Sequence, residues 1–316
     1  MRLDGIHHIT AITGDARRNL DYYTRVLGLR LTAKTVNQDQ PSVYHLFYGD
    51  ELARPGADLT FFEYPGAVPG RAGTGMVHRI VWRIASDDAL AFWADRLSNH
   101  GSEVHRGDGT VRFADFEGLE HELVVDSTND EPLTAEHPEI PAEFALRGFE
   151  GVRAYSYHPD GTAAVLESLM AAGRRDHGRW EVRGGKRGGW LALDEPPAER
   201  GRQSAGTVHH VAWGTTDAEQ GQWLERLNAA RVPNSGVIDR HYFHSIYFRE
   251  PGGVLFELAT EEPGFTVDGP VEELGERIIL PPWLESQRGQ VEARLTPLPD
   301  PRADWPSTTP AVTSRA

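Results

Sequence analysis

Hydrophobic and polar residues alternate along the chain in one pattern that recurs four times: an apolar strand, a polar helix cap, a helix of about three turns, then more strands. The first copy begins GIHHITAIT, continues through Asp15 as helix cap, and carries Leu20, Tyr23 and Leu27 on one helical face before Gly28 ends the helix. The other copies begin MVHRIVWRI, GVRAYSYH and TVHHVAWGT, and we expect their caps at Ser86 or Asp87, at Asp160 and at Asp217.

Short alternating or apolar runs follow each predicted helix. They include SVYHLFYG, DLTFFEY, VRFADF, HELVV, SIYFRE and VLFELA, with Pro-Gly and Glu-Gly turn signals between several of them. A strand–helix–strand–strand–strand module used four times therefore accounts for the chain up to about residue 260. The predicted fold class is α+β, built from four βαβββ modules.

Composition changes near the middle of the chain and at its end. The segment STNDEPLTAEHPEIP (127–141) is rich in proline and acidic residues and has no strand or helix period. We expect residues 1–126 to hold the first pair of modules, 127–147 to form a linker, and 148–285 to hold the second pair. Residues 286–316 become proline-rich and are expected to form a poorly ordered tail.

The overall composition excludes several classes of function. With 39% hydrophobic and 25% charged residues the chain reads as globular, and its net charge of −15 disfavours nucleic acid or an anionic membrane as partner. No apolar run approaches a membrane span, and the start MRLDGIHHIT does not resemble a signal peptide, so we expect a cytoplasmic protein. The chain has no cysteine, so any transition metal must be bound by histidine and carboxylate.

Aligning the four modules on their helix caps singles out one position. Seven residues before the cap stand His8 and His210 in modules one and four, and Arg79 and Arg153 in modules two and three. Consecutive strand residues point to opposite faces, so each His-His pair can aim only one ring at a shared point. The preceding position also holds histidine in module two, which favours His8 and His210 as the pair of ligands. The preceding residues in the four modules are His7, His78, Val152 and His209.

A glutamate in the last strand of module four supplies a third group. Glu257 lies between apolar neighbours in PGGVLFELAT, where a carboxylate is costly unless paired or metal-bound. The matching position holds Glu122 in module two, where Arg79 can neutralise it, and about Phe61 in module one. Two imidazoles and one carboxylate form the facial triad that suits divalent iron. The alternative is a pair of hydrogen-bonded core histidines without a metal.

The repeated module resembles the vicinal oxygen chelate superfamily, and within it the hydroquinone-type ring-cleaving dioxygenases. The matching stretches are GIHHITAITGDARRNLDYYTRVLGLRL, KTVNQDQPSVYHLFYGDELARPGADLTFF, GTVHHVAWGTTD and DRHYFHSIYFREPGGVLFELATEEPGF. The resemblance implies two incomplete β-barrels, one of which is formed by modules one and four and bears the metal. It assigns the metal to His8, His210 and Glu257, and the surrounding site to His7, Thr10, Arg240 and Tyr247. The role of His244, nearby in sequence, stays open.

The resemblance also implies a reaction, the opening of a hydroquinone- or catechol-type ring by dioxygen with Fe(II), or alternatively Mn(II), as cofactor. Arg240 would stabilise negative charge on the substrate, and Tyr247 and His7 would donate hydrogen bonds or move a proton. The structural alternatives are a surface ion pair for Arg240, packing for Tyr247 and a structural hydrogen bond for His7. The partners would be a small aromatic diol and dioxygen, and homo-oligomerisation is left open.

Two rival functions fit the same fold. A glyoxalase-type isomerase or lyase would use a redox-inert metal and usually a further carboxylate ligand, which module one lacks at the relevant place. A metal-free small-molecule-binding resistance protein would have no need of His8, His210 and Glu257 together.

Overall fold

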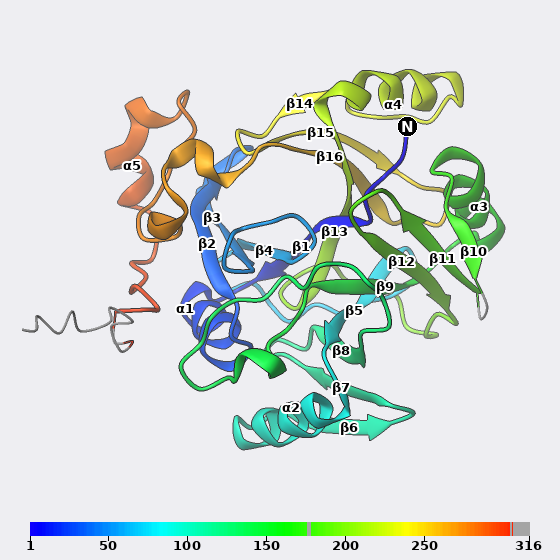
Figure 1. Ribbon diagram of the computed structural model, residues 1–316. Coiled ribbons are helices and arrows are strands. Elements are labelled where there is room, and N and C mark those ends of the chain that lie inside the picture. Colours follow the sequence, from blue (N-terminus) through cyan, green and yellow to red (C-terminus); the bar gives the residue numbers. More distant parts are fainter. Residues whose placement is uncertain (176–177, 304, 306–316) are drawn as a thin grey trace, which may run out of the picture.

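The structure is a computed structural model that describes residues 1–316 except 176–177, 304 and 306–316. Four modules follow one another along the chain (Figure 1). The first consists of β1 (Ile6–Thr13), α1 (Ala16–Asp21), the π-helical turn η1 (Tyr22–Val26), β2 (Arg30–Asn37), β3 (Gln40–Gly49) and β4 (Asp58–Glu63). The second consists of β5 (Met76–Ile84), α2 (Asp87–Asn99), β6 (Val104–Gly107), β7 (Thr110–Ala114) and β8 (Glu120–Val125).

The two later modules repeat this order after a connection that contains the single turn η2 (Ala142–Phe144). The third consists of β9 (Phe149–Tyr155), α3 (Pro159–Ala164), the π-helical turn η3 (Val165–Leu169), β10 (Gly173–Arg175), β11 (Arg179–Arg183) and β12 (Gly188–Asp194). The fourth consists of β13 (Thr207–Thr215), α4 (Asp217–Ala229), β14 (Ile238–Asp239), β15 (Phe243–Arg249) and β16 (Leu255–Pro263).

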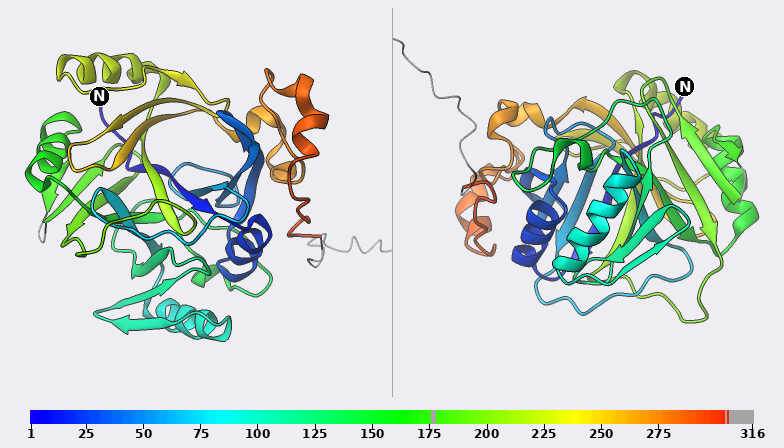
Figure 2. Two further views of the ribbon diagram at one scale, coloured as in Figure 1. Left: turned by 180° about the vertical axis from the view of Figure 1, so that it is seen from behind. Right: turned by 60° about the horizontal axis from the view of Figure 1, so that its bottom comes forward.

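The strands form two eight-stranded sheets, each made from one early and one late module. One sheet has the order β14-β15-β16-β13-β1-β4-β3-β2, and the other β10-β11-β12-β9-β5-β8-β7-β6. Modules one and four thus share a sheet, and modules two and three share the other, each joined through antiparallel first strands. Both sheets curl, and that of modules one and four opens toward the viewer in Figure 1 (reverse side in Figure 2). This confirms the α+β fold of four βαβββ modules.

The helices pack on the outer faces of the curled sheets, and their caps differ in part from those expected. Asp15 and Ser86 accept hydrogen bonds from the first turns of α1 and α2, as predicted. In α3 the capping side chain is that of His158, and Asp160 lies in the first turn. In α4 the cap is Thr216 and Asp217 is the first helical residue. An acidic residue in a first turn is favoured by the helix dipole, which is why sequence alone confuses it with a cap.

The segment after β16 packs against module one, beginning at β2, where the Ile279 N–H donates to the carbonyl oxygen of Lys34, and it stays ordered past residue 286, where a loose tail was predicted. Val291 and Leu295 are buried, and the Tyr44 hydroxyl donates a hydrogen bond to the carbonyl oxygen of Thr296. The end of the predicted tail, residues 304 and 306–316, lies outside the described part of the chain. The ordered elements here are η5 (Phe265–Asp268), η6 (Val271–Glu273), η7 (Glu285–Gln287) and α5 (Arg288–Glu292).

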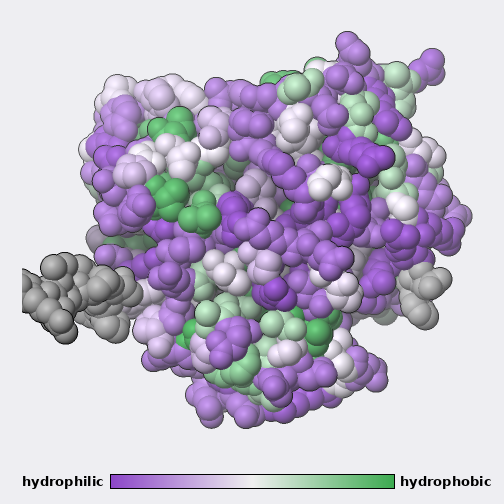
Figure 3. Space-filling view, in the orientation of Figure 1, coloured by the Kyte–Doolittle hydropathy of each residue, from purple (hydrophilic) through white to green (hydrophobic). Residues whose placement is uncertain are grey.

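Hydrophobic side chains are unevenly distributed over the surface. Figure 3 shows a mostly hydrophilic face, on which hydrophobic side chains gather beside the open end of the barrel of modules one and four. Among the described helices, none is both long and apolar enough to cross a membrane. The domain boundaries at residues 126, 147 and 285 stay a prediction. Each sheet joins one module from the first half of the chain with one from the second half.

Candidate metal centre

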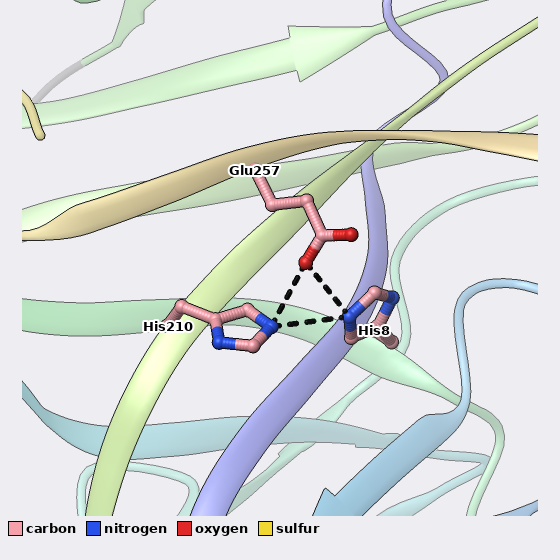
Figure 4. A group of neighbouring side chains, drawn as sticks. All are labelled: His8, His210 and Glu257. Carbon is pink, nitrogen blue, oxygen red and sulfur yellow. Dashed lines mark hydrogen bonds and ion pairs between the residues drawn. The ribbon is translucent and has the colours of Figure 1, made fainter. Parts of the chain in front are cut away.

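Three buried side chains from adjacent strands converge inside the barrel of modules one and four. Nε2 of His8 lies 3.1 Å and Nε2 of His210 lies 2.9 Å from Oε2 of Glu257, and the two nitrogens are 3.3 Å apart (Figure 4). None of the three side chains is more than 4% exposed. Within the described residues this is the group of His, Asp and Glu side chains close enough to hold one metal ion. The structure thus brings together the three residues that the sequence singled out.

A β-bulge in each central strand places the first histidine of each pair. Between β1 and β13, Ile6 pairs with Trp213 and His8 with Ala212, so His7 is an extra residue. Further along, Thr10 pairs with His210 and Ala11 with Val208, so His209 is an extra residue on β13. Because a bulge re-aims side chains, both neighbouring rings come into contact instead of pointing to opposite faces. Nδ1 of His7 lies 2.9 Å from Nδ1 of His8, and Nδ1 of His209 lies 2.8 Å from Nδ1 of His210.

The contacts of His7 determine which nitrogen of His8 is free for a metal. Nε2 of His7 lies 3.1 Å from the carbonyl oxygen of Thr260, which can only accept, so this nitrogen carries the proton. Burial is the main cause that lowers the pKa of His7 to about 3, so the ring is neutral and its Nδ1 accepts. Nδ1 of His8 must therefore donate, and Nε2, which faces Glu257, is the nitrogen that can bind a metal.

The carboxylate of Glu257 is held ionised in a buried place. Burial by itself would raise its pKa, but the imidazoles of His8 and His210 hold the pKa of Glu257 well below its ordinary value. Ser245 donates a hydrogen bond to Oε1, whereas Oε2 is a buried oxygen without a hydrogen-bond partner among the described residues. Ser245 was not predicted, since a serine in a strand carries no signal of this role.

These donors fit a divalent transition metal. Three ligand atoms about 2.1 Å from one ion and at right angles to one another lie about 3.0 Å apart, which matches the observed separations. Two imidazoles and one carboxylate are the donor set of the 2-His-1-carboxylate centre. We therefore regard His8, His210 and Glu257 as the candidate ligands.

A cavity of about 410 Å³ opens on His8 and His210. Arg240 and Tyr247, both predicted site residues, line it, with the guanidinium carbon 5.3 Å from the centre of the Tyr247 ring. Burial raises the pKa of Tyr247, so its hydroxyl stays protonated. Arg240 also forms an ion pair with Asp39 at 3.1 Å, and its carbonyl oxygen accepts from Gln38. These contacts join the turn between β2 and β3 to the β14–β15 connection at the cavity.

A row of hydroxyl and imidazole groups lies beside the ligands on the module-one side. Oγ1 of Thr10 lies 2.8 Å from Oγ1 of Thr60, and Thr60 lies 2.9 Å from Nε2 of His45. Thr10 was a predicted site residue and Thr60 and His45 were not. The alternation in SVYHLFYG, which puts His45 on the face of Phe47, was the signal that could have found His45.

His244 lies away from the candidate ligands. Its Nδ1 is 2.9 Å from Oδ1 of Asp217, the first residue of α4, and its side chain is 36% exposed. It is not among the residues that line the cavity. The structure gives it a local contact at the start of α4.

Strand register identifies the counterparts of the candidate ligands in the other modules. Glu257 pairs with Ala212, two residues after His210, and in module one Thr60 pairs with Thr10, two residues after His8. The counterpart of Glu257 is therefore Thr60, not Phe61, whose side chain belongs to the core with Tyr23 and Tyr48.

The sheet of modules two and three has charged pairs at the corresponding places. Glu122 pairs with the residue two places after Arg79, and Asp194 pairs with the residue two places after Arg153. Arg79 lies 3.1 Å from Glu122, as predicted, and 2.7 Å from Glu120, and Arg153 forms an ion pair with Asp194. With arginines in place of both histidines, these positions offer no imidazole to a metal.

Comparison with known proteins agrees with this fold. The model of the Glyoxalase/Bleomycin resistance protein/Dioxygenase superfamily matches residues 5–122 and 148–258. The chain belongs to this superfamily. It is 39% identical over 317 residues to MhqA of Bacillus subtilis, named as a candidate ring-cleaving dioxygenase, with 94% of this chain and 100% of the relative covered.

A second curated relative and two solved structures extend the comparison. The chlorohydroquinone/hydroquinone 1,2-dioxygenase of Sphingobium indicum is 31% identical over 312 residues, covering 92% of this chain and 95% of the relative. A crystal structure of a candidate dioxygenase from Bacillus subtilis superposes with a TM-score of 0.88 at 38% identity, covering 94% of this chain and 98% of the other. Glyoxalase I from Zea mays, with a TM-score of 0.57 at 17% identity over 81% of this chain and 92% of the other, shares the fold.

Proposed function

We propose that this protein is a non-haem, iron-dependent dioxygenase that opens the ring of a hydroquinone- or catechol-type substrate with dioxygen. The observation that carries the proposal is the buried group His8, His210 and Glu257, with separations of 2.9 to 3.3 Å, at a cavity of about 410 Å³. The names of the relatives, which include a chlorohydroquinone/hydroquinone 1,2-dioxygenase, support the choice of substrate class. Mn(II) is the alternative ion for the same donors.

The bound ion would supply a Lewis acid for a phenolic oxygen and an open position beside it for dioxygen. The protein's own residues have separable tasks. Arg240, on the cavity wall, attracts the negative charge that a phenol acquires on losing its proton. Tyr247, whose pKa is raised by burial, keeps its proton and offers a hydrogen-bond donor beside Arg240. His7 fixes the tautomer of His8 and thus positions a ligand without touching the substrate.

The aromatic lining suits a planar ring. Phe47, Phe62, Phe243 and Tyr242 contribute aromatic surface to the cavity, and polar side chains make up much of the rest of its wall. The aromatic part of the wall can pack against a ring, and the polar part can bind the oxygen atoms that the ring carries. A cavity of about 410 Å³ is at the small end of ligand sites, in keeping with a single substituted ring.

Two rival functions fit these residues less well. A glyoxalase-type isomerase with a further carboxylate ligand would need one from module one, where Thr60 stands at the counterpart of Glu257. A metal-free binding protein would have no need to bury two imidazoles together with one carboxylate.

The proposal is tested by loading the protein anaerobically with Fe(II), measuring its metal content, and following oxygen uptake with substituted hydroquinones and catechols. We expect about one iron per chain and oxygen uptake that depends on both iron and the diol. Iron bound without oxygen uptake for any diol would favour the isomerase, and the absence of metal binding would favour the metal-free protein.

A further inference from the structure

His45 is a polar residue on an otherwise aromatic part of the cavity wall. On β3, Tyr44, Leu46 and Tyr48 pack into the main hydrophobic core, so His45 and Phe47 face the barrel interior. The His45 ring centre lies 4.0 Å from that of Phe47 and 4.4 Å from that of Phe62. Contacts with these two aromatic rings restrict the orientation of the imidazole.

The two nitrogens of His45 have different surroundings. Nε2 is 2.9 Å from the Thr60 hydroxyl, which is itself 2.8 Å from the Thr10 hydroxyl. Nδ1 has no hydrogen-bond partner among the described residues. It is also absent from the fully buried polar atoms without a partner, so solvent can reach it. Because His45 lines the cavity, Nδ1 is open to it. One nitrogen is thus anchored by protein, and the other is free to meet a ligand.

The position of His45 suits an oxygen at the far end of a ring. It is not part of the group that could hold the metal. In the sheet, β3 is separated from β1 by β4, and His45 pairs with Phe62, which pairs with Ile12, four residues after His8. The backbone of His45 is therefore about 16 Å from that of His8, about 10 Å across the strands and about 13 Å along them. The two oxygens of a catechol are neighbours and both reach one ion. The two oxygens of a hydroquinone lie at opposite ends of the ring, so one must be bound by protein.

We propose that Nδ1 of His45 forms a hydrogen bond with the second hydroxyl of a para-dihydroxy aromatic substrate whose first oxygen lies at the His8–His210–Glu257 centre. This rests on the proposed function and adds to it a residue that selects between hydroquinones and phenols without the second oxygen. Either tautomer of His45 serves, because a phenolic hydroxyl both donates and accepts. The Thr60 hydroxyl likewise adapts to either tautomer, since it rotates to donate or accept at Nε2.

The test compares two ligands of equal shape, hydroquinone and 4-methylphenol, which has a methyl group in place of the second hydroxyl. Their dissociation constants are measured by calorimetry without oxygen on the iron-loaded protein, His45→Phe, His45→Gln and the matched control His244→Phe. The wild type is expected to bind hydroquinone about tenfold more tightly than 4-methylphenol, the strength of one hydrogen bond. His45→Phe should bring the ratio close to 1, His45→Gln should keep part of it, and His244→Phe should leave it unchanged.

Each other outcome counts against a defined part of the proposal. If both ligands bind and the ratio of dissociation constants is the same in His45→Phe as in wild type, His45 does not bind the second hydroxyl, although the proposed function stands. If neither ligand binds to the iron-loaded wild type, the proposed function itself fails. Thermal unfolding of each variant shows whether it is folded, and the more conservative His45→Gln provides the comparison if His45→Phe is not.

Discussion

Glu122 and Glu257 occupy the same position in two related sheets. Glu122 lies on the last strand of module two and pairs with the residue two places after Arg79. Glu257 lies on the last strand of module four and pairs with the residue two places after His210. Glu122 is neutralised by Arg79 at 3.1 Å, whereas Glu257 faces two imidazole nitrogens. One carboxylate therefore belongs to an ion pair and the other to the candidate metal centre, and this contrast supplies a matched pair of variants.

Glu257→Gln should abolish iron binding and oxygen uptake, because it removes the one anionic donor of the candidate centre. We expect activity to fall by at least about a hundredfold, which is more than the loss from changing a residue that only orients a ligand. Metal analysis and an oxygen electrode measure both effects. Glu122→Gln, the same substitution at the equivalent register, should keep its iron and its activity. Normal iron content in Glu257→Gln would show that the ligand assignment is wrong.

His7→Phe should weaken iron binding without removing a ligand. The substitution removes the Nδ1 acceptor that fixes the tautomer of His8, so the His8 ring is free to present the wrong nitrogen. The affinity for iron should fall by about 10- to 100-fold, as is usual for such partners. Competition with a chelator measures it. An affinity equal to that of wild type would reduce His7 to a packing residue.

Arg79→Ala should destabilise the protein and leave turnover intact. Removing the guanidinium leaves Glu122 and Glu120 without their shared partner, and Glu122 is only 12% exposed. We expect a loss of about 1–2 kcal/mol in the free energy of unfolding, measured with urea. Arg25→Ala, which breaks an exposed pair with Asp21, is the control and should cost less than about 0.5 kcal/mol. A stable but inactive Arg79→Ala would give the second sheet a role in catalysis.

Asp58→Asn should stabilise the protein at neutral pH. Asp58 is buried, neither oxygen has a hydrogen-bond partner among the described residues, and burial, followed by the charge of Asp50, raises its pKa well above the ordinary value. In the unfolded chain the Asp58 carboxyl ionises above about pH 4, whereas in the folded protein it keeps its proton to a higher pH. The Asp58 carboxyl therefore lowers the stability of the fold as the pH rises. We expect a gain of about 1–3 kcal/mol in the free energy of unfolding at pH 7.

The control for Asp58 is Asp50→Asn. The Asp50 carboxylate accepts hydrogen bonds from the side chain and backbone nitrogen of Arg54, so its loss should destabilise the protein. Urea unfolding at pH 7 and at pH 4 measures both variants. The advantage of Asp58→Asn should shrink at the lower pH, and an equal advantage at both pH values would contradict an origin in ionisation.

The buried His121 should make stability fall in mild acid. Burial is the main cause that lowers the pKa of His121 to about 3, from 6.5 in an exposed ring. Above pH 6.5 the ring is neutral in both states and has no effect. As the pH falls from 6.5 toward 3 only the unfolded state binds the proton, so the folded state loses stability. In urea unfolding, His121→Gln should show a shallower pH dependence than wild type over the accessible part of this range; identical slopes would contradict it.

The sequence by itself determined the repeat, the α+β class and the three candidate ligands. Alternation along a strand is local, and a recurring module aligns equivalent positions without knowledge of how the modules pack. His8 and His210 share one place in this alignment, and Glu257 stands out as a carboxylate among apolar residues. Their convergence within 3.3 Å agrees with that selection, while metal binding stays a prediction.

Only the tertiary structure decided what depends on contacts between distant strands. The bulges at His7 and His209 arise where β1 meets β13, and they turn neighbouring rings toward each other against the simple alternation. The register between β1 and β4 puts Thr60, not Phe61, opposite the place of Glu257. The curl of the sheet likewise brings His45 into the cavity with Arg240. Pairing partners, register and curvature come from interactions across the sheet, and a one-dimensional pattern does not contain them.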